Sequence, residues 1–265
     1  MTRQIIKSRN ETPNYLTTME ILSDEETPVD VKVVLQRMIE HDYWVAHYRT
    51  PCETPIFRLY SDGLQQLPSE IRKKITGGFE LDVENCYPSL LSQITHDTGL
   101  ACPILDEYVM NRDKYLALDM EHFFISRTEA KNIYFSAIFD EECDYETVFS
   151  QRLRREIKKI IRTFYSFNKF DDLRNMKYNT SLCSNYSTIG RYTDEKTCLL
   201  ALILERAERT VLDVMVDSLE EYGVKVIAEL FDGVLVGGQI YVKIINDVER
   251  QVKKQTGFNI TLKIK

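Results

Sequence analysis

The sequence is poor in glycine and lacks the glycine-rich loops that bind phosphate groups. It has 10 Gly in 265 residues, with neither a Gly-x-Gly-x-x-Gly fingerprint nor a Gly-Lys-Ser/Thr loop. Its six Cys form no Cys-x-x-Cys pair, which argues against a zinc knuckle or a redox dithiol and favours reduced thiols. The four histidines show no metal-ligand spacing and are expected to be structural: His41, His47, His96 and His122.

Long apolar runs are also missing. No stretch of about 18 apolar residues is present, and the charged segment 1–10 has no apolar core of a signal peptide. We therefore expect a soluble, intracellular protein of the cytoplasm or nucleus that makes no membrane contact. Hydrophobic residues make up 43% of the chain, which is ordinary for a globular protein and excludes disorder of the whole chain.

The charge is acidic overall but unevenly distributed. The formal net charge is −7, yet residues 151–177 hold nine basic and three acidic residues. The basic side chains Arg152, Arg154, Arg155, Lys158, Lys159 and Arg162 fall on one predicted helix. Such a positive stripe is typical of a nucleic acid-binding surface, and a solvated helix face is the alternative.

The pattern of apolar residues predicts alternating helices and short strands. Capping residues, proline positions and periodicity predict helices over Val31–His47 (N-cap Asp30), Pro88–His96, Arg127–Phe139 (capping box Ser126 and Glu129), Thr147–Phe167, Thr193 or Asp194 to Tyr222, and Gln239–Lys254. Strands are predicted over Phe79–Val83, Val224–Leu230, Val234–Val236 and Phe258–Ile264. A polar connection is expected before Ser126, and a loop or lid over 168–190.

Two carboxylates stand out by their positions. Asp82 ends an apolar strand, and Asp232 lies at the tip of the hairpin around Phe231-Asp232-Gly233. Alone, each has an ordinary explanation, a helix cap for Asp82 and a turn residue for Asp232. On neighbouring strands, the pair can hold two divalent ions roughly 3.5–4 Å apart. We expect Mg²⁺, with Mn²⁺ as a substitute, because Mg²⁺ needs few protein carboxylates and accepts phosphate oxygens.

One helix face combines cations with aromatic rings. Arg127, Lys131, Phe135 and Phe139 recur at a spacing of four. Two cations followed by two rings suit a triphosphate followed by a base. The alternative is an amphipathic helix with both Phe in the core and the two cations reaching solvent.

The string from Arg127 to Phe139 resembles the nucleotide-binding fingers helix of family A DNA polymerases. Three more stretches, in the family's order, resemble its other motifs: Arg58–Ser61 with Leu64-Gln65, Leu67-Pro68 and Arg72; Leu81–Tyr87 as the first palm carboxylate motif; and Glu229–Val234 as the second. The resemblance covers about residues 55–265. Phe231, Gly233, Tyr87 and Phe139-Asp140 depart from the family pattern. Asp82, Asn85 and Pro88 together with Phe-Asp-Gly resemble the compact branch encoded by transposons and viruses.

The resemblance implies an α+β fold, a right-hand palm with an antiparallel sheet, helical fingers and a reduced thumb. Its segments would be 1–57 (N-terminal helical region and reduced thumb), 58–125 (palm, first part), 126–190 (fingers) and 191–265 (palm, second part). It implies template-directed DNA synthesis from dNTPs on a primer-template, without proofreading, in the host compartment of a virus or mobile element. A helicase, primase or processivity factor is the protein partner expected.

The resemblance also assigns residues. Asp82 and Asp232 would be catalytic and would hold two metal ions together with the Val83 carbonyl. Nucleotide binding falls to Arg127, Lys131, Phe135, Phe139 and Tyr87, with Tyr87 excluding the 2′-hydroxyl or, alternatively, serving as a core tyrosine. Nucleic acid binding falls to Arg58, Gln65, Arg72 and the six basic residues of 152–162. Two other functions stay open, a catalytically idle palm that binds nucleic acid or a replication partner, and an RNA-synthesising enzyme.

Overall fold

The computed structural model describes residues 5–11, 13–40, 44–49, 58–174 and 194–265. The fold is α+β, as predicted. The chain forms two compact units. The sheet unit contains Met1–Glu84 and Glu208–Lys265, and the helical unit contains Asn85–Ala207. The helical unit is therefore inserted in the sequence between two parts of the sheet unit.

The sheet unit is built around four antiparallel strands in the order β4-β5-β3-β6. These strands are β3 (Phe79–Val83), β4 (Lys225–Glu229), β5 (Gly233–Gly237) and β6 (Leu262–Ile264). The predicted strand at β3 is confirmed to the residue, and the predicted hairpin of β4 and β5 is confirmed. Only the last three residues of the strand predicted from Phe258 pair with β3.

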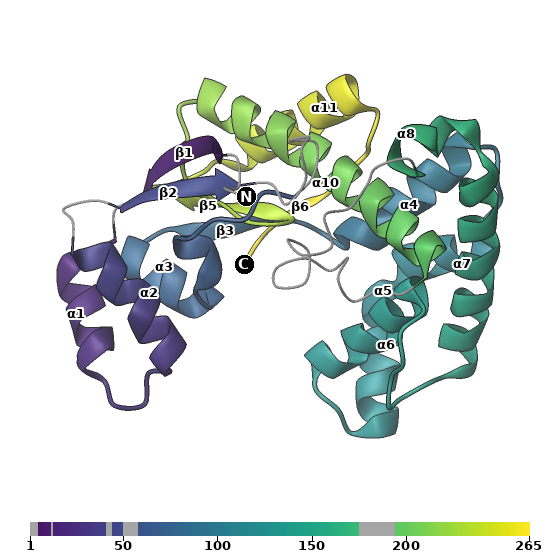
Figure 1. The fold of residues 1–265 in the computed structure, drawn as a ribbon, viewed down its shortest axis with the longest axis horizontal. Helices are drawn as coiled ribbons and strands as arrows, with labels where there is room; N and C mark the ends of the chain where they lie inside the picture. Colours follow the sequence, from purple (N-terminus) through teal and green to yellow (C-terminus); the bar gives the residue numbers. More distant parts are fainter. Residues whose placement is uncertain (1–4, 12, 41–43, 50–57, 175–193) are drawn as a thin grey trace. The chain divides into compact units, whose positions relative to one another are not determined.

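Helices cover both faces of this sheet (Figure 1). One face carries α1 (Tyr15–Ser23), α2 (Val29–Ile39) and α3 (Ser69–Thr76), which bury Leu35, Met38 and Ile75 against strand residues Ala228 and Leu235. The other face carries residues 208–221 of α10 (Glu195–Glu221) together with α11 (Val242–Thr256). Burial of these apolar side chains stabilises the unit, at about 1.5–3 kcal/mol for each large side chain.

The N-terminal region differs from the prediction. The expected helix over Val31–His47 begins at Val29, with Pro28 and not Asp30 at its N-cap, and it ends at Ile39. Trp44–Arg49 form strand β2, which pairs with β1 (Ile5–Glu11). Trp, Val and Tyr in this segment favour a pleated strand, and the alternation buries Ala46 and Tyr48 completely. The prediction that the helix continues to His47 was therefore wrong. Residues 1–4, 12, 41–43 and 50–57 lie outside the described part.

The helical unit contains six helical segments in its described residues and the first part of α10. The segments are α4 (Cys86–Asp97), α5 (Pro103–Phe123), α6 (Arg127–Phe139), α7 (Val148–Ser166), η2 (Asn168–Phe170) and α8 (Asp171–Arg174). The limits of α6 and its capping box are as predicted. The polar connection predicted before Ser126 is wrong, because Pro103–Phe123 form α5, which contacts α4, α6 and α7.

Several predicted boundaries hold within a few residues. Asp194 accepts a hydrogen bond from Thr197 N at the start of α10, whereas Thr193 lies outside the described residues. The loop predicted over 168–190 is wrong for its first part, because Asn168–Phe170 and Asp171–Arg174 are helical and bury Phe170 and Leu173, and its remainder, 175–190, lies outside the described residues. A short 3₁₀ segment, η1 (Leu64–Gln66), precedes α3. Among the described residues, no helix is both long and apolar enough to cross a bilayer.

Candidate functional site

The two predicted carboxylates lie on neighbouring strands. Asp82 pairs with Gly233 in the β3–β5 ladder, and Val83 N donates a hydrogen bond to Asp232 O at 2.8 Å. Leu230 N donates to Gly233 O at 2.9 Å, which closes the hairpin around Phe231 and Asp232. The strand register therefore confirms the prediction that the fold brings these two aspartates together.

Gly233 makes this approach possible. A Cβ atom at this position would overlap Asp82 Oδ1 and lie 2.5 Å from Leu81 O. The second of these atoms belongs to the backbone of β3, so it cannot rotate away. A larger side chain would not fit this geometry, and a glycine lets the hairpin pack directly on β3.

Glu80 and Asp82 occupy the same face of β3, since they are two residues apart, but their surroundings differ. Glu80 accepts hydrogen bonds from Arg72 Nε at 2.9 Å and from Ser69 Oγ at 2.8 Å. Asp82 is 4% exposed, and its Oδ1 has no hydrogen-bond partner among the described residues. Glu80 is thus a carboxylate satisfied within the protein, whereas Asp82 retains a buried oxygen available to a ligand.

Electrostatics at Asp82 favour a cation. Burial raises the pKa of Asp82, and the nearby charge of Asp232 raises it further. The Lys265 ammonium group, which forms an ion pair with Asp82 Oδ2, opposes both effects. A divalent ion between two such carboxylates would neutralise their mutual repulsion. Lys265 was not predicted to lie at this site, although the alternation Lys263-Ile264-Lys265 is typical of an edge strand.

Two residues that were predicted to bind nucleic acid, Arg58 and Gln65, contact the same hairpin. Arg58 Nη2 donates to the buried Glu208 at 2.7 Å, and its guanidinium lies 4.7 Å from the centre of the Phe231 ring. Gln65 Nε2 donates to Glu229 O at 3.2 Å, and its Oε1 accepts from Ser61 N at 2.8 Å. These contacts anchor both side chains beside Asp232.

Arg72, the third of these residues, contacts β3 and the segment before α3 instead of the hairpin. Its guanidinium is 13% exposed and is held by Glu80 and by the carbonyl of Leu67. In this structure it therefore ties α3 to β3. Its predicted contact with nucleic acid stays a prediction, as does the metal contact of the Val83 carbonyl.

The predicted nucleotide-binding side chains lie together in the helical unit. Tyr87, 7% exposed, stacks on Phe135 with ring centres 6.5 Å apart, and Phe139 packs edge-on against it at 5.8 Å. Arg127 and Lys131 are exposed on the preceding turns of α6, and Arg127 pairs with Asp113 at 2.6 Å. Tyr87 is therefore a core residue, as its alternative role predicts. It also packs against the two rings that were predicted to bind the nucleotide, Phe135 and Phe139.

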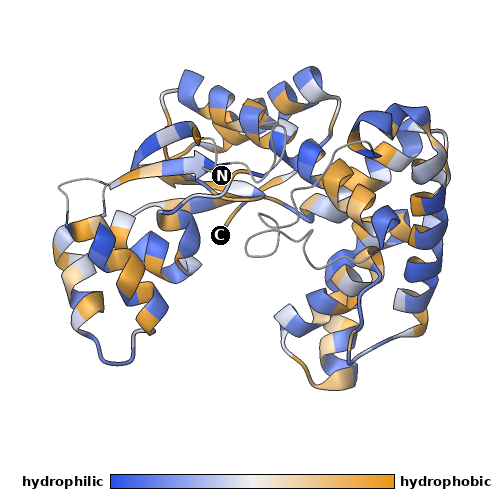
Figure 2. Cartoon of the chain, in the orientation of Figure 1, coloured by the Kyte–Doolittle hydropathy of each residue, from blue (hydrophilic) through white to orange (hydrophobic). Residues whose placement is uncertain are grey.

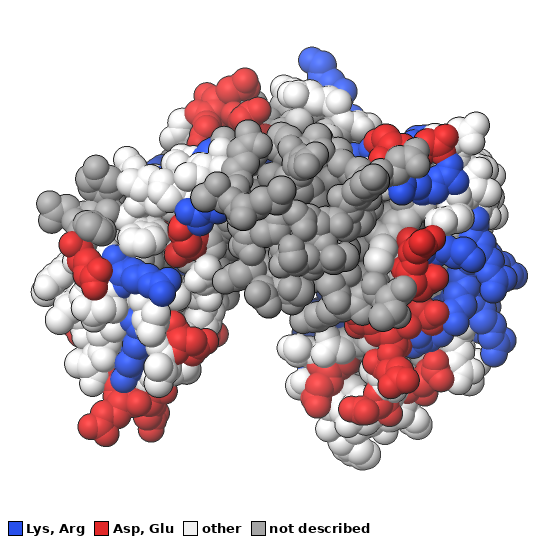
Figure 3. Space-filling model, viewed as in Figure 1, with Lys and Arg blue, Asp and Glu red and all other residues white. Residues whose placement is uncertain are grey.

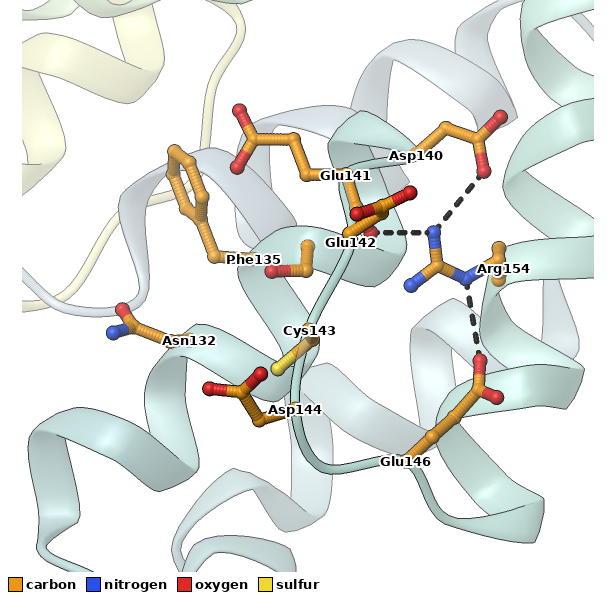
Figure 4. A pocket seen from close by; sticks show the side chains of 10 residues that line it. Asn132, Phe135, Asp140, Glu141, Glu142, Cys143, Asp144, Glu146 and Arg154 are labelled. Atoms are coloured by element: carbon orange, nitrogen blue, oxygen red, sulfur yellow. Dashed lines mark hydrogen bonds and ion pairs between the residues drawn. The ribbon is translucent and has the colours of Figure 1, made fainter.

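Phe135 also lines a pocket of about 940 Å³ (Figure 4). The other lining residues are mainly acidic and come from the loop between α6 and α7: Asp140, Glu141, Glu142, Asp144 and Glu146. Arg154 reaches into this loop and pairs with Asp140 at 3.1 Å and Glu146 at 3.5 Å. An acidic lining repels phosphate groups, so the pocket is a poor site for a triphosphate.

The basic stripe of α7 is confirmed as a surface feature (Figure 2, Figure 3). Its apolar side is buried through Leu153, Ile157 and Phe164, and Lys and Arg side chains gather on its hydrophilic side. The exposed cations are Arg152, Arg155, Lys158, Lys159 and Arg162. Lys158 pairs with Asp140 at 3.0 Å, and Arg154 is half-buried. A shallow pocket of about 300 Å³ includes three of these cations among its lining: Arg152, Arg155 and Lys159.

Comparison with known proteins gives one informative relative. The chain is 24% identical over 218 residues to the Sputnik virophage protein named "Putative helicase V13". The match covers 78% of this chain but 28% of the relative, so the chain spans about a quarter of that protein's length. No family model matches the chain.

This relative corrects the predicted activity. Its name points to a helicase, whereas the sequence motifs led us to expect a template-directed DNA polymerase. The prediction of DNA synthesis was therefore wrong. The motif resemblance misled because paired carboxylates and a helix with spaced cations serve phosphate chemistry in many proteins, whatever the reaction. The relative's viral origin and its helicase name agree with the coarser expectation of a viral protein related to nucleic acid.

Proposed function

We propose that this chain is a nucleic acid-acting enzyme module of a helicase-type viral protein, in which Asp82 and Asp232 hold divalent metal ions against a phosphate group. The observation that carries the proposal is the buried Asp82 Oδ1, which lacks a hydrogen-bond partner among the described residues and lies beside a second carboxylate. A buried polar atom without a partner is costly, and a bound cation removes that cost.

Mg²⁺ suits this donor set, because it accepts oxygen ligands and retains several waters for phosphate oxygens. When bound, it would neutralise charge on a phosphate and activate an attacking oxygen. Arg58 would lie beside such a phosphate, since Phe231 and Glu208 fix its guanidinium at the hairpin. The ring and the carboxylate restrict the motion of this side chain, so its positioning loses little entropy on binding.

The remaining motif resemblance supports a finer proposal for the architecture. We assign the sheet with Asp82 and the β4–β5 hairpin to a palm-like core, and α6 to a nucleotide-binding helix. Arg127 and Lys131 then contact phosphates through the exposed turns of α6. The acidic pocket beside Phe135 would receive no phosphate.

The match to part of a helicase-named protein supports the proposal that the partner of this chain is a helicase motor. The 265 residues contain no Gly-Lys-Ser/Thr loop, the motif with which many motor proteins bind the phosphates of ATP. The chain matches 28% of the relative. We therefore assign to this chain the engagement of nucleic acid rather than the motor step, with a helicase motor as its partner.

The test measures metal and nucleic acid together. Mn²⁺ binding is followed by electron paramagnetic resonance, and binding of labelled DNA and RNA by fluorescence anisotropy, with and without Mg²⁺. Phosphate and pyrophosphate release from nucleoside triphosphates is followed in the same samples. The variants are Asp82→Asn and Asp232→Asn, and the matched control is Asp217→Asn, an exposed aspartate of the same unit.

We expect each site variant to weaken Mn²⁺ binding at least about tenfold, because each removes one carboxylate from the site. Metal-dependent turnover or nucleic acid binding should fall with it, while the control matches the wild type. Equal Mn²⁺ binding in all four proteins would refute the metal site. Retained metal binding without any interaction with nucleic acid would refute the function.

A further inference from the structure

A second cluster of donor atoms lies in the helical unit, away in sequence from both aspartates. His96 lies in the last turn of α4, Cys102 immediately precedes α5, and Asp106 lies in the first turn of α5. His96 was predicted to be structural, because the sequence shows no metal-ligand spacing around it. The loop 98–101 folds back between the two helices and brings them together.

The distances within the cluster are those of a coordination triangle. Cys102 Sγ lies 3.7 Å from His96 Nε2 and 3.4 Å from Asp106 Oδ1, and His96 Nε2 lies 3.0 Å from Asp106 Oδ2. Tetrahedral zinc, with bonds of about 2.0–2.3 Å to nitrogen, oxygen and sulfur, separates its ligands by about 3.3–3.6 Å. One ion can therefore contact all three groups with only small side-chain movements.

The surroundings hold the ligands in position. Ser92 Oγ donates a hydrogen bond to Asp106 Oδ1 at 2.6 Å, which orients the carboxylate as outer-shell groups do at metal sites. Cys102 is fully buried, whereas the His96 side chain is 54% exposed. The cluster thus has a buried sulfur at its base and an open side where water supplies a fourth ligand.

We propose that His96, Cys102 and Asp106 bind one transition-metal ion, best matched by Zn²⁺, which joins the end of α4 to the start of α5. The mixed nitrogen, sulfur and oxygen donors select a borderline-soft ion and disfavour Mg²⁺, which takes oxygen ligands. This site is independent of Asp82 and Asp232. A hydrogen-bonded cluster that retains its thiol proton is the competing explanation.

Co²⁺ is the probe for the test, because a thiolate ligand gives it a charge-transfer band in the near ultraviolet. The full chain is stripped with a chelator, titrated with Co²⁺ and then back-titrated with Zn²⁺. The variants are Cys102→Ser, His96→Gln, Asp106→Asn and Ser92→Ala. The controls are Cys143→Ser and His122→Gln, which lie outside the cluster.

In the wild type we expect the thiolate band to saturate at one equivalent of Co²⁺ bound at this cluster, to disappear when Zn²⁺ displaces that ion, and the melting temperature to rise with Zn²⁺. Cys102→Ser should abolish the charge-transfer band. His96→Gln and Asp106→Asn should weaken binding by about 100-fold or more, and Ser92→Ala by about 10–100-fold. Both controls should behave as the wild type.

Two results would overturn the proposal. One is a wild type without the thiolate band, which would leave a hydrogen-bonded cluster. The other is a band that persists in Cys102→Ser and disappears in Cys143→Ser. Because His96 is half-exposed, His96→Gln should fold normally, so the Co²⁺ titration stays decisive even if a substitution at buried Cys102 lowers stability.

Discussion

The interior of the sheet unit and helix α7 of the helical unit place their charges in opposite ways. In the sheet unit, acidic side chains are buried and matched to cations: Glu229 is 1% exposed and contacts Lys7 at 2.5 Å, Arg9 at 2.9 Å and Arg209 at 3.0 Å. In the helical unit, the cations of α7 lie on its solvent side. Burial alone would raise the pKa of Glu229, but Lys7 and Arg209 outweigh it and lower the pKa.

This difference decides which residues are informative. Where buried charges are matched, as in the sheet unit, a buried carboxylate oxygen without a partner marks a place for a ligand. Where charges are exposed, as on α7, a cation has no such meaning, because solvent satisfies it at little cost. Asp82 therefore says more about function than any single cation of α7.

The largest effect is expected at the buried carboxylate with three cationic neighbours. Glu229→Ala leaves Lys7, Arg9 and Arg209 without their shared partner, and breaking a buried pair costs about 3–5 kcal/mol. Urea unfolding measures this loss. The control is Glu220→Ala, since Glu220 pairs with the same Arg9 at 2.7 Å but is 47% exposed. Equal losses in the two variants would remove the distinction between buried and exposed carboxylates.

A pH-dependent effect of similar size is expected at Glu11, which is fully buried. Burial raises its pKa to about 7, although Leu64 N and Tyr48 Oη donate hydrogen bonds to its carboxylate. Because the folded pKa exceeds the unfolded value, the protonated form favours folding. This contribution is fully present below about pH 4.5 and is lost as the pH rises to about 7, a total of about 3 kcal/mol.

Glu11→Gln removes this titration. We expect the variant to lose the fall in stability between about pH 4.5 and 7, as seen in urea unfolding across that range. A wild type whose stability is flat over the same interval would show that Glu11 ionises normally.

A smaller effect is expected at the hairpin. Gly233→Ala forces a Cβ against Asp82 and the Leu81 carbonyl, and overpacking of this kind costs about 1–3 kcal/mol. It should also displace Asp82 and weaken Mn²⁺ binding. Gly237→Ala is the control, because its Cβ would approach no atom closer than 3.3 Å, and that atom belongs to the Ile227 side chain. Normal Mn²⁺ binding by Gly233→Ala would separate the hairpin from the metal site.

The smallest effect on stability is expected on α7. Replacing Arg155, Lys159 and Arg162 together by Gln should change unfolding by less than about 0.5 kcal/mol, because the three are exposed. The same change should reduce the salt dependence of duplex binding, by about 0.9 in logarithmic slope for each phosphate that the variant no longer neutralises. Glutamines at Lys243, Lys253 and Lys254 of α11 are the matched control. An unchanged slope would show that the cations of α7 form only a solvated helix face and do not bind the duplex.

Local signals predicted much of this fold. Ser126 and Glu129 set the start of α6 because a capping box depends on residues close in sequence. The two apolar runs on either side of Phe231-Asp232-Gly233 likewise predicted the hairpin. By contrast, α5 was missed because its charged and polar residues are spread around the helix, so packing against α4, α6 and α7 decides its conformation.

The candidate sites divide in the same way. Asp82 and Asp232 could be predicted to lie close together, because one ends a predicted strand, the other lies at the tip of a predicted hairpin, and hairpins commonly pair with a neighbouring strand. The pairing of Lys265 with Asp82 required the register of β6, which only the assembled sheet fixes. The approach of His96 to Cys102 depends on how the loop 98–101 turns, and no periodicity reports this.

The insertion of the helical unit within the sheet unit has a consequence for biosynthesis. Strand β3 leaves the ribosome early, but both of its neighbours, β5 and β6, follow the whole inserted segment. Asn85–Ala207 can therefore fold while β3 still has unpaired edges, and Asp82 and Asp232 come together only after the β4–β5 hairpin has emerged. A chain stalled before Asp232 would carry α4 to α8 without the Asp82–Asp232 pair, so the proposed metal site could form only after the helical unit has been synthesised.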